Sequence, residues 1–492
     1  MKLNEVLYQS ILKHQANNAF CINEKYYSYS EFWEQIQGFY FQIKNLETPI
    51  GIYCKNDIQT YAAVLACLLA ETPYIPIHPS YPIHRINDIL GQANIQHILL
   101  PYDEIPADLK ELKINFIFFQ KNEKVAKIIL SKKENPLGYI LFTSGSTGKP
   151  KGVPINVKNL STFIESYNAS GFEITQNDKV LQMFELTFDL SVMSFLMPIL
   201  SGACVYTLPE DGIKYMETYK ILEENEITIA LLVPSIINSL QPYFDDIDLP
   251  KLRLNLFCGE ALYENVITNW KKCVPNAVIY NVYGPTEDTI FCTSYLVENN
   301  PKSYNGICCI GKAMPFNSNV IFNLESIQNG NYKLAEIDEK GELCLSGNQL
   351  TDGYLNDELK NKIAFFEFKN TRYYRTGDLC FMDKNQDVFY AGRLDHQVKV
   401  KGGFRVELSE IENVAIEFCK NQVAAVTKMN QNNMHLIHLF IQKNGQSSAE
   451  VLAHLKTHLP DYMLPEKIHE LENFPLNNSG KIDRPKLKEM LL

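Results

Sequence analysis

Short apolar runs alternate with longer amphipathic stretches along most of this chain. The runs are rich in Val, Ile, Leu and Phe and end in Gly, Pro or Ser, which is typical of strands buried on both faces. They cover residues 138–142, 227–233, 252–258 and 277–281. With helical patterns between them, they predict α/β layers with ligand-binding loops at the strand ends.

The pattern changes toward the C-terminus. Beyond Gly341, strand-like segments indicate a smaller β subdomain. After Asp395 helices and strands are mixed in an α+β layout, expected at 408–418, 423–427, 435–441, 449–458 and 467–471. We therefore predict an α/β (α+β multidomain) protein with a large domain over 1–394 and a small C-terminal domain over 395–492.

The N-terminal segment, the longest apolar run and the cysteines together predict a cytoplasmic protein. Residues 1–18 carry Leu and Ile at helical intervals with charges between them, which predicts an amphipathic helix and not a signal peptide. The longest nearly unbroken apolar run, 61–70, is too short to cross a bilayer. The 12 cysteines lack the spacing of a zinc or redox site, so free thiols in a reducing compartment are expected.

The charge balance narrows the partners. With 46 Lys and Arg against 57 Asp and Glu, the net charge is −11. Such a field repels phosphate-rich surfaces, so neither nucleic acid nor a membrane is expected as a partner. Residues 395–492 carry no net charge, so the acidic excess lies upstream of them.

The clearest chemical signal is a loop of glycines and hydroxyls directly after the apolar run 138–142. It reads Thr143-Ser144-Gly145-Ser146-Thr147-Gly148-Lys149. Its backbone N–H groups, hydroxyls and ammonium group can surround phosphate oxygens. It is not a Walker A loop, because Pro150 stands where the Mg²⁺-binding Ser or Thr would be. By itself the loop predicts a nucleotide or another phosphate ligand.

Six further strings follow this loop in a fixed order. They are Asn281-Val282-Tyr283-Gly284-Pro285-Thr286-Glu287, Gly341-Glu342-Leu343, Tyr374-Arg375-Thr376-Gly377-Asp378, Gly392-Arg393-Leu394-Asp395, Arg405-Val406-Glu407 and Asn478-Ser479-Gly480-Lys481-Ile482-Asp483. Together with the loop they resemble the signature of the adenylate-forming ligases, the superfamily of acyl-CoA synthetases, luciferase and peptide synthetase adenylation domains. The resemblance covers nearly the whole chain.

The resemblance implies an ATP site. In it Tyr283 stacks on adenine, Asn281 binds the adenine amino group and Asp378 accepts the ribose hydroxyls, which suits an aromatic face, an amide and a carboxylate. The implied ATP-binding residues are Thr143, Ser144, Gly145, Ser146, Thr147, Gly148, Lys149, Asn281, Val282, Tyr283, Gly284, Pro285, Thr286, Asp378, Tyr390, Ala391, Gly392, Arg393 and Lys481.

The resemblance also implies the catalytic groups. Glu287 is similar to the ligand of Mg²⁺, the expected cofactor, and a carboxylate oxygen suits that hard ion. Lys481 is similar to a mobile lysine that reaches the substrate carboxylate and the α-phosphate, where charge builds during the reaction. Thr143 completes the implied catalytic set, and Asp395 is the implied hinge of the small domain.

The amino-acid-activating branch of the superfamily places an aspartate against the substrate ammonium, and Asp189 matches it. The other implied pocket positions are Leu190, Met193, Leu232, Leu256, Cys258, Val282, Ile290 and Phe291. None of them is charged, so a small and weakly polar substrate side chain is expected.

Two strings, 188–193 and 257–260, closely resemble the D-alanine-activating carrier protein ligases. In that family the cysteine at the position of Cys258 touches the substrate methyl group. Spacing alone favours a buried core thiol for Cys258, and it is the resemblance that favours a place in the pocket. Two departures stand out: Phe291 is bulkier than expected there, and the segment 401–405 carries one Gly more than usual, where the family contacts the pantetheine arm.

These features predict an enzyme, a ligase that activates a small amino acid, D-alanine first, as aminoacyl-AMP. It would then load the phosphopantetheine thiol of a carrier protein supplied in trans. The main alternative is a stand-alone peptide synthetase adenylation enzyme for another small amino acid, such as L-Ala or Ser. An acyl-CoA ligase and an inactive nucleotide-binding homologue are weaker alternatives, opposed by Asp189 and by the retained Lys481, Glu287 and Asp378.

Overall fold

The chain forms two compact units in the computed structural model. The model describes residues 2–491 apart from 102–103, 121–127, 129, 131–132, 146–148, 395–396, 401, 444–445 and 477–481. Unit 1 comprises Met1–Pro79, Ala93–Leu141 and Val153–Leu394, and unit 2 comprises Ser80–Gln92, Phe142–Gly152 and Asp395–Leu492. Two segments from the N-terminal part thus pack with the C-terminal residues. The proposed functional division at 394/395 stays a prediction.

The largest sheet of unit 1 has nine strands in the order β17-β14-β13-β12-β11-β9-β10-β1-β2. It is parallel from β13 to β1 and antiparallel at both ends. Its strands are β1 (Asn18–Ile22), β2 (Lys25–Ser28), β9 (Lys179–Gln182), β10 (Cys204–Thr207), β11 (Ile229–Leu232), β12 (Leu254–Phe257), β13 (Val278–Tyr283), β14 (Thr293–Leu296) and β17 (Lys312–Ala313).

A second sheet has six strands in the order β6-β5-β3-β4-β7-β8. Its strands are β3 (Ile50–Tyr53), β4 (Tyr74–Ile77), β5 (His97–Leu100), β6 (Asn115–Phe118), β7 (Leu137–Thr143) and β8 (Lys151–Asn156). The glycine and hydroxyl loop joins β7 to β8, so it follows a strand as the sequence predicts.

Helices pack against the sheets of unit 1. They are α1 (Leu3–Lys13), α2 (Tyr29–Ile43), α3 (Ile58–Ala70), α5 (Val157–Ala169), α6 (Leu190–Ser201), α7 (Lys214–Glu224), α8 (Pro234–Leu240), α9 (Glu264–Cys273), α10 (Leu324–Gln328) and α11 (Glu358–Ala364), with short 3₁₀ turns at Ala107–Leu109, Gln241–Asp246 and Thr286–Asp288. The apolar run 61–70 lies in α3, of which every residue but Gln59 is buried. A helix apolar on all sides belongs in the interior, which explains why that run shows no amphipathic period.

The β subdomain predicted beyond Gly341 is a third sheet of unit 1, in which β18, β19, β21 and β20 follow one another and β22 pairs with β21. Its strands are β18 (Asn317–Asn323), β19 (Gly341–Gly347), β20 (Phe365–Phe368), β21 (Thr371–Met382) and β22 (Val388–Arg393). A hairpin of β15 (Ser303–Tyr304) and β16 (Ile307–Cys308) completes unit 1.

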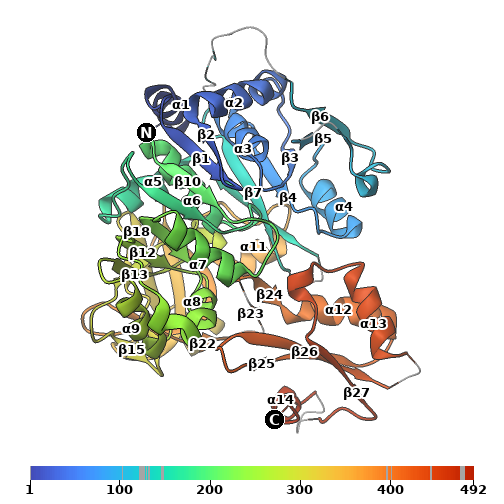
Figure 1. The fold of residues 1–492 in the computed structure, drawn as a ribbon. Coiled ribbons are helices and arrows are strands. Elements are labelled where there is room, and N and C mark those ends of the chain that lie inside the picture. Colours follow the sequence, from blue (N-terminus) through green and yellow to red (C-terminus); the bar gives the residue numbers. More distant parts are fainter. Residues whose placement is uncertain are drawn as a thin grey trace. The chain divides into compact units, whose positions relative to one another are not determined.

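The C-terminal part of unit 2 contains a three-stranded sheet of β25 (Val423–Met429), β26 (His435–Gln442) and β27 (Lys467–Leu471). Helices α12 (Leu408–Cys419) and α13 (Ser448–Lys456) cover one face of it and α14 (Arg484–Glu489) the other (Figure 1). The alternation along β25 explains this, because Val423 and Ala425 join the core beneath α12 and α13 while Ala424 and Val426 pack with Leu487 of α14. Unit 2 also contains α4 (Ile83–Gln92), β23 (Gln397–Lys399), β24 (Arg405–Glu407) and a 3₁₀ turn at Asp461–Met463.

The predicted α/β class is confirmed, and the strands and helices expected from the pattern are present within a few residues of their predicted limits. The N-terminal helix is shorter than predicted: α1 ends at Lys13, because the chain turns into β1 from Asn18. All 12 cysteines are free. Among the described residues, no helix combines the length and the apolar character that a membrane span requires.

Candidate active site

The nucleotide-binding residues expected on β13 are tied to the third sheet by hydrogen bonds. The hydroxyl of Tyr283, the last residue of β13, donates to Oδ2 of Asp378 at 2.5 Å. Nη1 of Arg393 donates to Oδ1 of the same carboxylate and to the carbonyl oxygen of Thr376, both at 2.8 Å. Asp378 and Arg393 are register partners on β21 and β22, which explains why they meet. We call Tyr283, Asp378 and Arg393 the Asp378 cluster.

The surroundings of Tyr283 keep its phenol protonated. Burial, followed by the charge of Asp378, raises the pKa of Tyr283 well above its ordinary value. The phenol therefore remains a donor at neutral pH, and the carboxylate between it and Arg393 is balanced by a cation. Asn281, two residues earlier on β13, donates from Nδ2 to the carbonyl oxygen of Cys309 at 2.9 Å, which sets the orientation of its amide.

The turn after β13 brings two carboxylates into the interior. Glu287 is fully buried, and its Oε1 accepts from the hydroxyl of Tyr354 at 2.7 Å. Asp288 is also fully buried, and neither of its carboxylate oxygens accepts from an N–H or O–H group among the residues that the structure describes, so that the thiol of Cys292 is the donor beside it. Burial raises the pKa of Asp288 to about 7; the neighbouring thiol of Cys292 opposes the rise and the charge of Glu287 adds to it. The motif did not point to Asp288, whose burial depends on the tertiary fold.

A glycine is required at the start of this turn. A Cβ atom on Gly284 would lie 2.3 Å from the Cα atom of Phe291 and 2.9 Å from the carbonyl oxygen of Ile290. The returning chain passes directly over it, in a strained path in which Ile290 has a φ of 77°. The motif glycine therefore serves a close backbone approach.

Strand register decides which implied pocket residues share a face. Leu231, Leu256 and Tyr280 are partners on β11, β12 and β13, and Cys258 and Val282 lie two residues further along their strands. Since side chains alternate, these positions point to one face at the carboxyl edge of the sheet.

The opposite face belongs to helix α9. Asn255 of β12 accepts a hydrogen bond from Nε1 of Trp270 in α9 at 2.8 Å. Phe257 is two residues further along β12, so it points to the same face as Asn255. Leu232 pairs with Phe257, so it lies on the α9 side. The register thus disfavours the sequence-based choice of Leu232 as a pocket residue and points to Leu231 instead. A shift of one residue could not be detected without the strand pairing.

The bulk of Phe291 is absorbed by aromatic packing. Its ring is fully buried and contacts Phe163 of α5 edge-on at 5.0 Å between centroids, with Tyr167 at 6.4 Å. The departure noted in the sequence is therefore matched by partners on α5. Asp189 directly precedes α6, is 4% exposed, and is followed by the buried Leu190 and Met193.

The phosphate-binding candidates of unit 2 are described in part. Thr143, Ser144, Gly145 and Lys149 are described, whereas Ser146, Thr147, Gly148, the implied hinge Asp395 and the implied catalytic Lys481 lie outside the described residues. The hydroxyl of Thr143 is buried and has no hydrogen-bond partner within the described part of the chain. Such a hydroxyl is available to a ligand.

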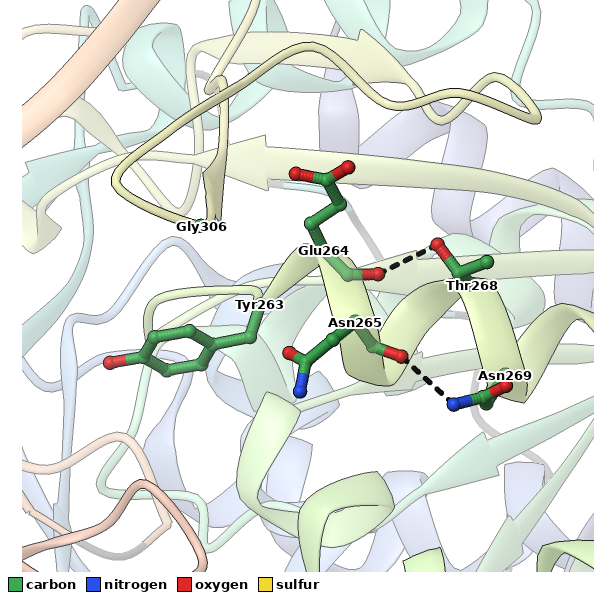
Figure 2. Close-up of a pocket in the computed structure, with 6 residues that line it drawn as sticks. All are labelled: Tyr263, Glu264, Asn265, Thr268, Asn269 and Gly306. Atoms are coloured by element: carbon green, nitrogen blue, oxygen red, sulfur yellow. Dashed lines mark hydrogen bonds between the residues drawn. The ribbon is translucent and has the colours of Figure 1, made fainter.

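A surface depression elsewhere in unit 1 contains none of these residues. It lies at the start of α9 and is formed by Tyr263, Glu264, Asn265, Thr268, Asn269 and Gly306 (Figure 2). Figure 2 shows that Thr268 and Asn269 donate to the carbonyl oxygens of Glu264 and Asn265, one helical turn back. These polar groups serve the helix, and we assign the depression no part in catalysis.

Comparison with known proteins agrees with this geometry. The family described as AMP-binding enzyme matches residues 8–355. The chain belongs to the AMP-binding enzyme family. It is 29% identical to the D-alanine–D-alanyl carrier protein ligase of Bacillus licheniformis, over 99% of both chains, and 31% identical to the ligase of the same name from Listeria monocytogenes serotype 4b, over 94% of this chain and 93% of that protein. A solved structure of the Vibrio cholerae adenylation domain AlmE, in complex with glycyl-adenosine-5'-phosphate, superposes with a TM-score of 0.87 at 28% identity and covers 99% of this chain and 97% of that one. The resemblance inferred from the motifs is thereby confirmed.

The donors of this AMP-binding enzyme can be tested for a fit to Mg²⁺. Among the described residues there is no group of three or more His, Cys, Asp or Glu side chains that could by themselves hold a metal ion. Mg²⁺ in nucleotide sites usually takes one or two protein carboxylates, with phosphate oxygens and water completing its six positions. Glu287 supplies one carboxylate, held in place by Tyr354, so the residues fit an ion that arrives with ATP.

Proposed function

We propose that this AMP-binding enzyme joins ATP and a small amino acid, D-alanine first, into aminoacyl-AMP, and then transfers the aminoacyl group to the phosphopantetheine thiol of a separate carrier protein. The observation that carries the amino-acid assignment is Asp189, a buried carboxylate directly before α6. A carboxylate at this buried position attracts a cation strongly, and a substrate ammonium placed beside it would form a charge-assisted hydrogen bond.

The assignment of D-alanine rests on two supports. Two relatives named D-alanine–D-alanyl carrier protein ligase align with this chain over almost their whole length. The face formed by Leu231, Leu256, Cys258 and Val282 is apolar and buried, which suits a small apolar side chain such as that of alanine.

The chemistry then follows from the positions of the chain's own groups. Tyr283 and Asn281 would hold the adenine, and the Asp378 cluster would hold the ribose, so that the α-phosphorus is fixed relative to the substrate carboxylate. Mg²⁺ bound with ATP through Glu287 would neutralise charge on the phosphate oxygens. The substrate carboxylate oxygen attacks the α-phosphorus, pyrophosphate leaves, and Lys481 would stabilise the charge that builds on both reacting groups.

Transfer to the carrier would be a second step in a different arrangement. The pantetheine thiolate attacks the carbonyl carbon of aminoacyl-AMP, AMP leaves with the bonding electron pair, and a thioester forms. We propose that rotation of the small domain about Asp395 withdraws Lys481 between the two steps, because one arrangement cannot both hold the lysine in the site and admit the pantetheine arm. The ATP requirement and the free thiols favour the cytoplasm as the location.

The test is amino-acid-dependent exchange of pyrophosphate into ATP. A panel of both enantiomers of Ala, Ser, Pro and Val, together with Gly, should show the highest kcat/KM for D-Ala. Loading of a phosphopantetheinylated D-alanyl carrier protein should then follow with the same amino acid. Exchange with none of these amino acids, or exchange that no carrier protein can complete, would contradict the proposal.

A second candidate is a stand-alone adenylation enzyme for another small amino acid. It is favoured by the similarity to the Vibrio cholerae domain solved with glycyl-adenosine-5'-phosphate. The same panel separates the two candidates, since a preference for Gly, L-Ala or L-Ser over D-Ala would select this one.

A further inference from the structure

A buried ion pair joins two segments of unit 2 that are far apart in sequence. Nη1 of Arg85, in α4, donates to Oε1 of Glu410, in the first turn of α12, at 3.0 Å. The side chains are 2% and 1% exposed. Burying two charges costs several kcal/mol of desolvation for each ion, so such a pair needs further hydrogen bonds to be tolerated.

Those further bonds come from the glycine and hydroxyl loop. The second carboxylate oxygen of Glu410, Oε2, accepts the backbone N–H of Gly145 at 2.9 Å. The hydroxyl of Ser144 donates to the carbonyl oxygen of Arg405 at 2.8 Å and accepts the N–H of Glu407 at 3.1 Å. The start of the loop is thus held by three residues of β24 and α12, namely Arg405, Glu407 and Glu410. We call these three residues, together with Arg85, the loop clamp.

The chemistry of the loop clamp matches that of a bound phosphate. Loops of this kind offer backbone N–H groups and hydroxyls to phosphate oxygens. Here the Glu410 carboxylate accepts the N–H of Gly145, and the Arg405 carbonyl oxygen accepts from the hydroxyl of Ser144, so both donors are already occupied. Burial raises the pKa of Glu410, while Arg85 and the Gly145 N–H oppose the rise.

The guanidinium of Arg85 has further capacity. Its Nε and Nη2 atoms are buried and have no hydrogen-bond partner within the described part of the chain. A cation with two unused donors lies beside a loop built for anions, and one carboxylate uses only part of it.

We propose that Glu410 is an internal counter-anion of the phosphate loop: its carboxylate, positioned by Arg85, occupies the Gly145 N–H and is displaced when a nucleotide phosphate binds there. The proposal rests on the proposed function only in taking the loop to bind ATP. Glu410 is a positioning residue, because it acts on the loop and not on the reacting atoms. It follows that the Glu410-bound and phosphate-bound forms of the loop exclude one another, and that the measured affinity for ATP is lowered by the population of the first form.

The experiment compares Glu410→Gln with Glu412→Gln. Gln keeps the shape of Glu410 but replaces a charge-assisted hydrogen bond by a weaker neutral one. Glu412 is a matched control, since it lies on the same helix, accepts from Nη2 of Arg484 at 2.7 and 2.9 Å, and accepts the N–H of Ala425 at 2.7 Å. The probe is ATP carrying a methylene bridge between the α- and β-phosphorus atoms, with Mg²⁺, and its Kd is measured by calorimetry.

Glu410→Gln should bind this analogue about three- to tenfold more tightly than the wild type, and should lower the KM for ATP in pyrophosphate exchange by a similar factor with kcat little changed. Glu412→Gln should change neither constant by more than about twofold. An unchanged or weaker affinity of Glu410→Gln would overturn the proposal, because it would mean that Glu410 does not compete with phosphate.

A double variant separates competition from simple charge. Arg85→Met combined with Glu410→Gln removes both buried charges, so it leaves no unpaired ion to unfold the unit and no freed cation to attract phosphate. Tighter binding that persists in the double variant supports displacement at Gly145, and its disappearance overturns it. Because the analogue binds without an amino acid, failure of the exchange panel with an intact difference in Kd would reject the proposed function alone.

Discussion

The Asp378 cluster and the loop clamp solve the same problem in opposite ways. Both hold polar groups that a nucleotide would contact. In the Asp378 cluster Asp378 and Arg393 are register partners on β21 and β22, and Tyr283, on β13 of the nine-stranded sheet, donates to the same carboxylate. In the loop clamp the partners of Ser144 and Gly145 come from residues more than 250 positions away in the chain.

This difference separates a fixed site from an exchangeable one. Strand pairing sets the positions of Asp378 and Arg393, and the hydrogen bond from Tyr283 holds the third member, before any ligand arrives. A site preorganised in this way has a lower ordering cost on binding. The bonds of the loop clamp occupy the donors that the ligand needs. Binding there must exchange one anion for another, so its energetics depend on a difference between two competitors.

The largest effect is expected at Lys481, which would act on the phosphate end of the nucleotide, as the loop does. Lys481→Ala should slow aminoacyl-AMP formation by about 10³-fold, since an ammonium that stabilises transition-state charge contributes on this scale. Its segment is polar and close to the C-terminus, so the melting temperature should change little. Exchange kinetics and calorimetry check both halves, and near wild-type exchange would contradict the role assigned to this residue.

Breaking the Asp378 cluster should affect binding and stability together. Asp378→Asn removes the charge opposite Arg393 and should reduce kcat/KM for ATP by about 10²-fold while lowering the free energy of unfolding by about 2 kcal/mol. Asp387→Asn is the control, because Asp387 lies directly before β22 and pairs with Lys302, away from the cluster. An equal change of the ATP constants in both variants would show that the cluster acts only through general stability.

Asp288, also in unit 1, contrasts with Asp378: it is a buried carboxylate with no N–H, O–H or cationic partner among the described residues, beside the weakly donating thiol of Cys292. Its folded-state pKa of about 7 lies above the ordinary unfolded value near 4, so the native state holds a proton that the unfolded state has released. Its contribution to stability is therefore present at low pH and lost as the pH rises from about 4 to 7. Asp288→Asn should raise the free energy of unfolding by about 2 kcal/mol at pH 8 and change it little at pH 4. Denaturation with urea at both pH values checks this, and an equal effect at both would contradict it.

The smallest effect is expected at Cys258, on the pocket face of the nine-stranded sheet. Cys258→Ala should relax the discrimination among Gly, D-Ala and D-Ser by about 1 kcal/mol, since apolar pockets sort methyl-sized differences on this scale. Leu232→Ala, on the α9 side of the sheet, should lower stability without changing the order of preference. The exchange panel measures both variants, and an unchanged order in Cys258→Ala would make this residue a core thiol.

Much of this protein could be predicted from local pattern. Alternating apolar runs and helical periods depend on short-range geometry, so β7, β12, β25 and α12 fall close to their predicted positions. The motifs around Thr143, Tyr283 and Asp378 are equally local, and with their order along the chain they identified the AMP-binding enzymes before any contact was known.

What only the tertiary structure decided are the relations between distant residues. Whether Leu231 or Leu232 shares a face with Cys258 depends on strand register. Two adjacent leucines in the sequence do not show which of them points to that face. The burial of Asp288 beside the Cys292 thiol and the aromatic packing of Phe291 depend on which side chains the fold brings near. Arg85 and Glu410 are 325 positions apart in the chain. Taken singly in the sequence, each would be predicted to be an ordinary exposed charge. The sequence by itself determined the chemical groups and the elements that carry them, because those follow from nearest-neighbour sterics and hydropathy. Which group meets which was decided by packing, since burial and pairing are properties of the folded chain as a whole.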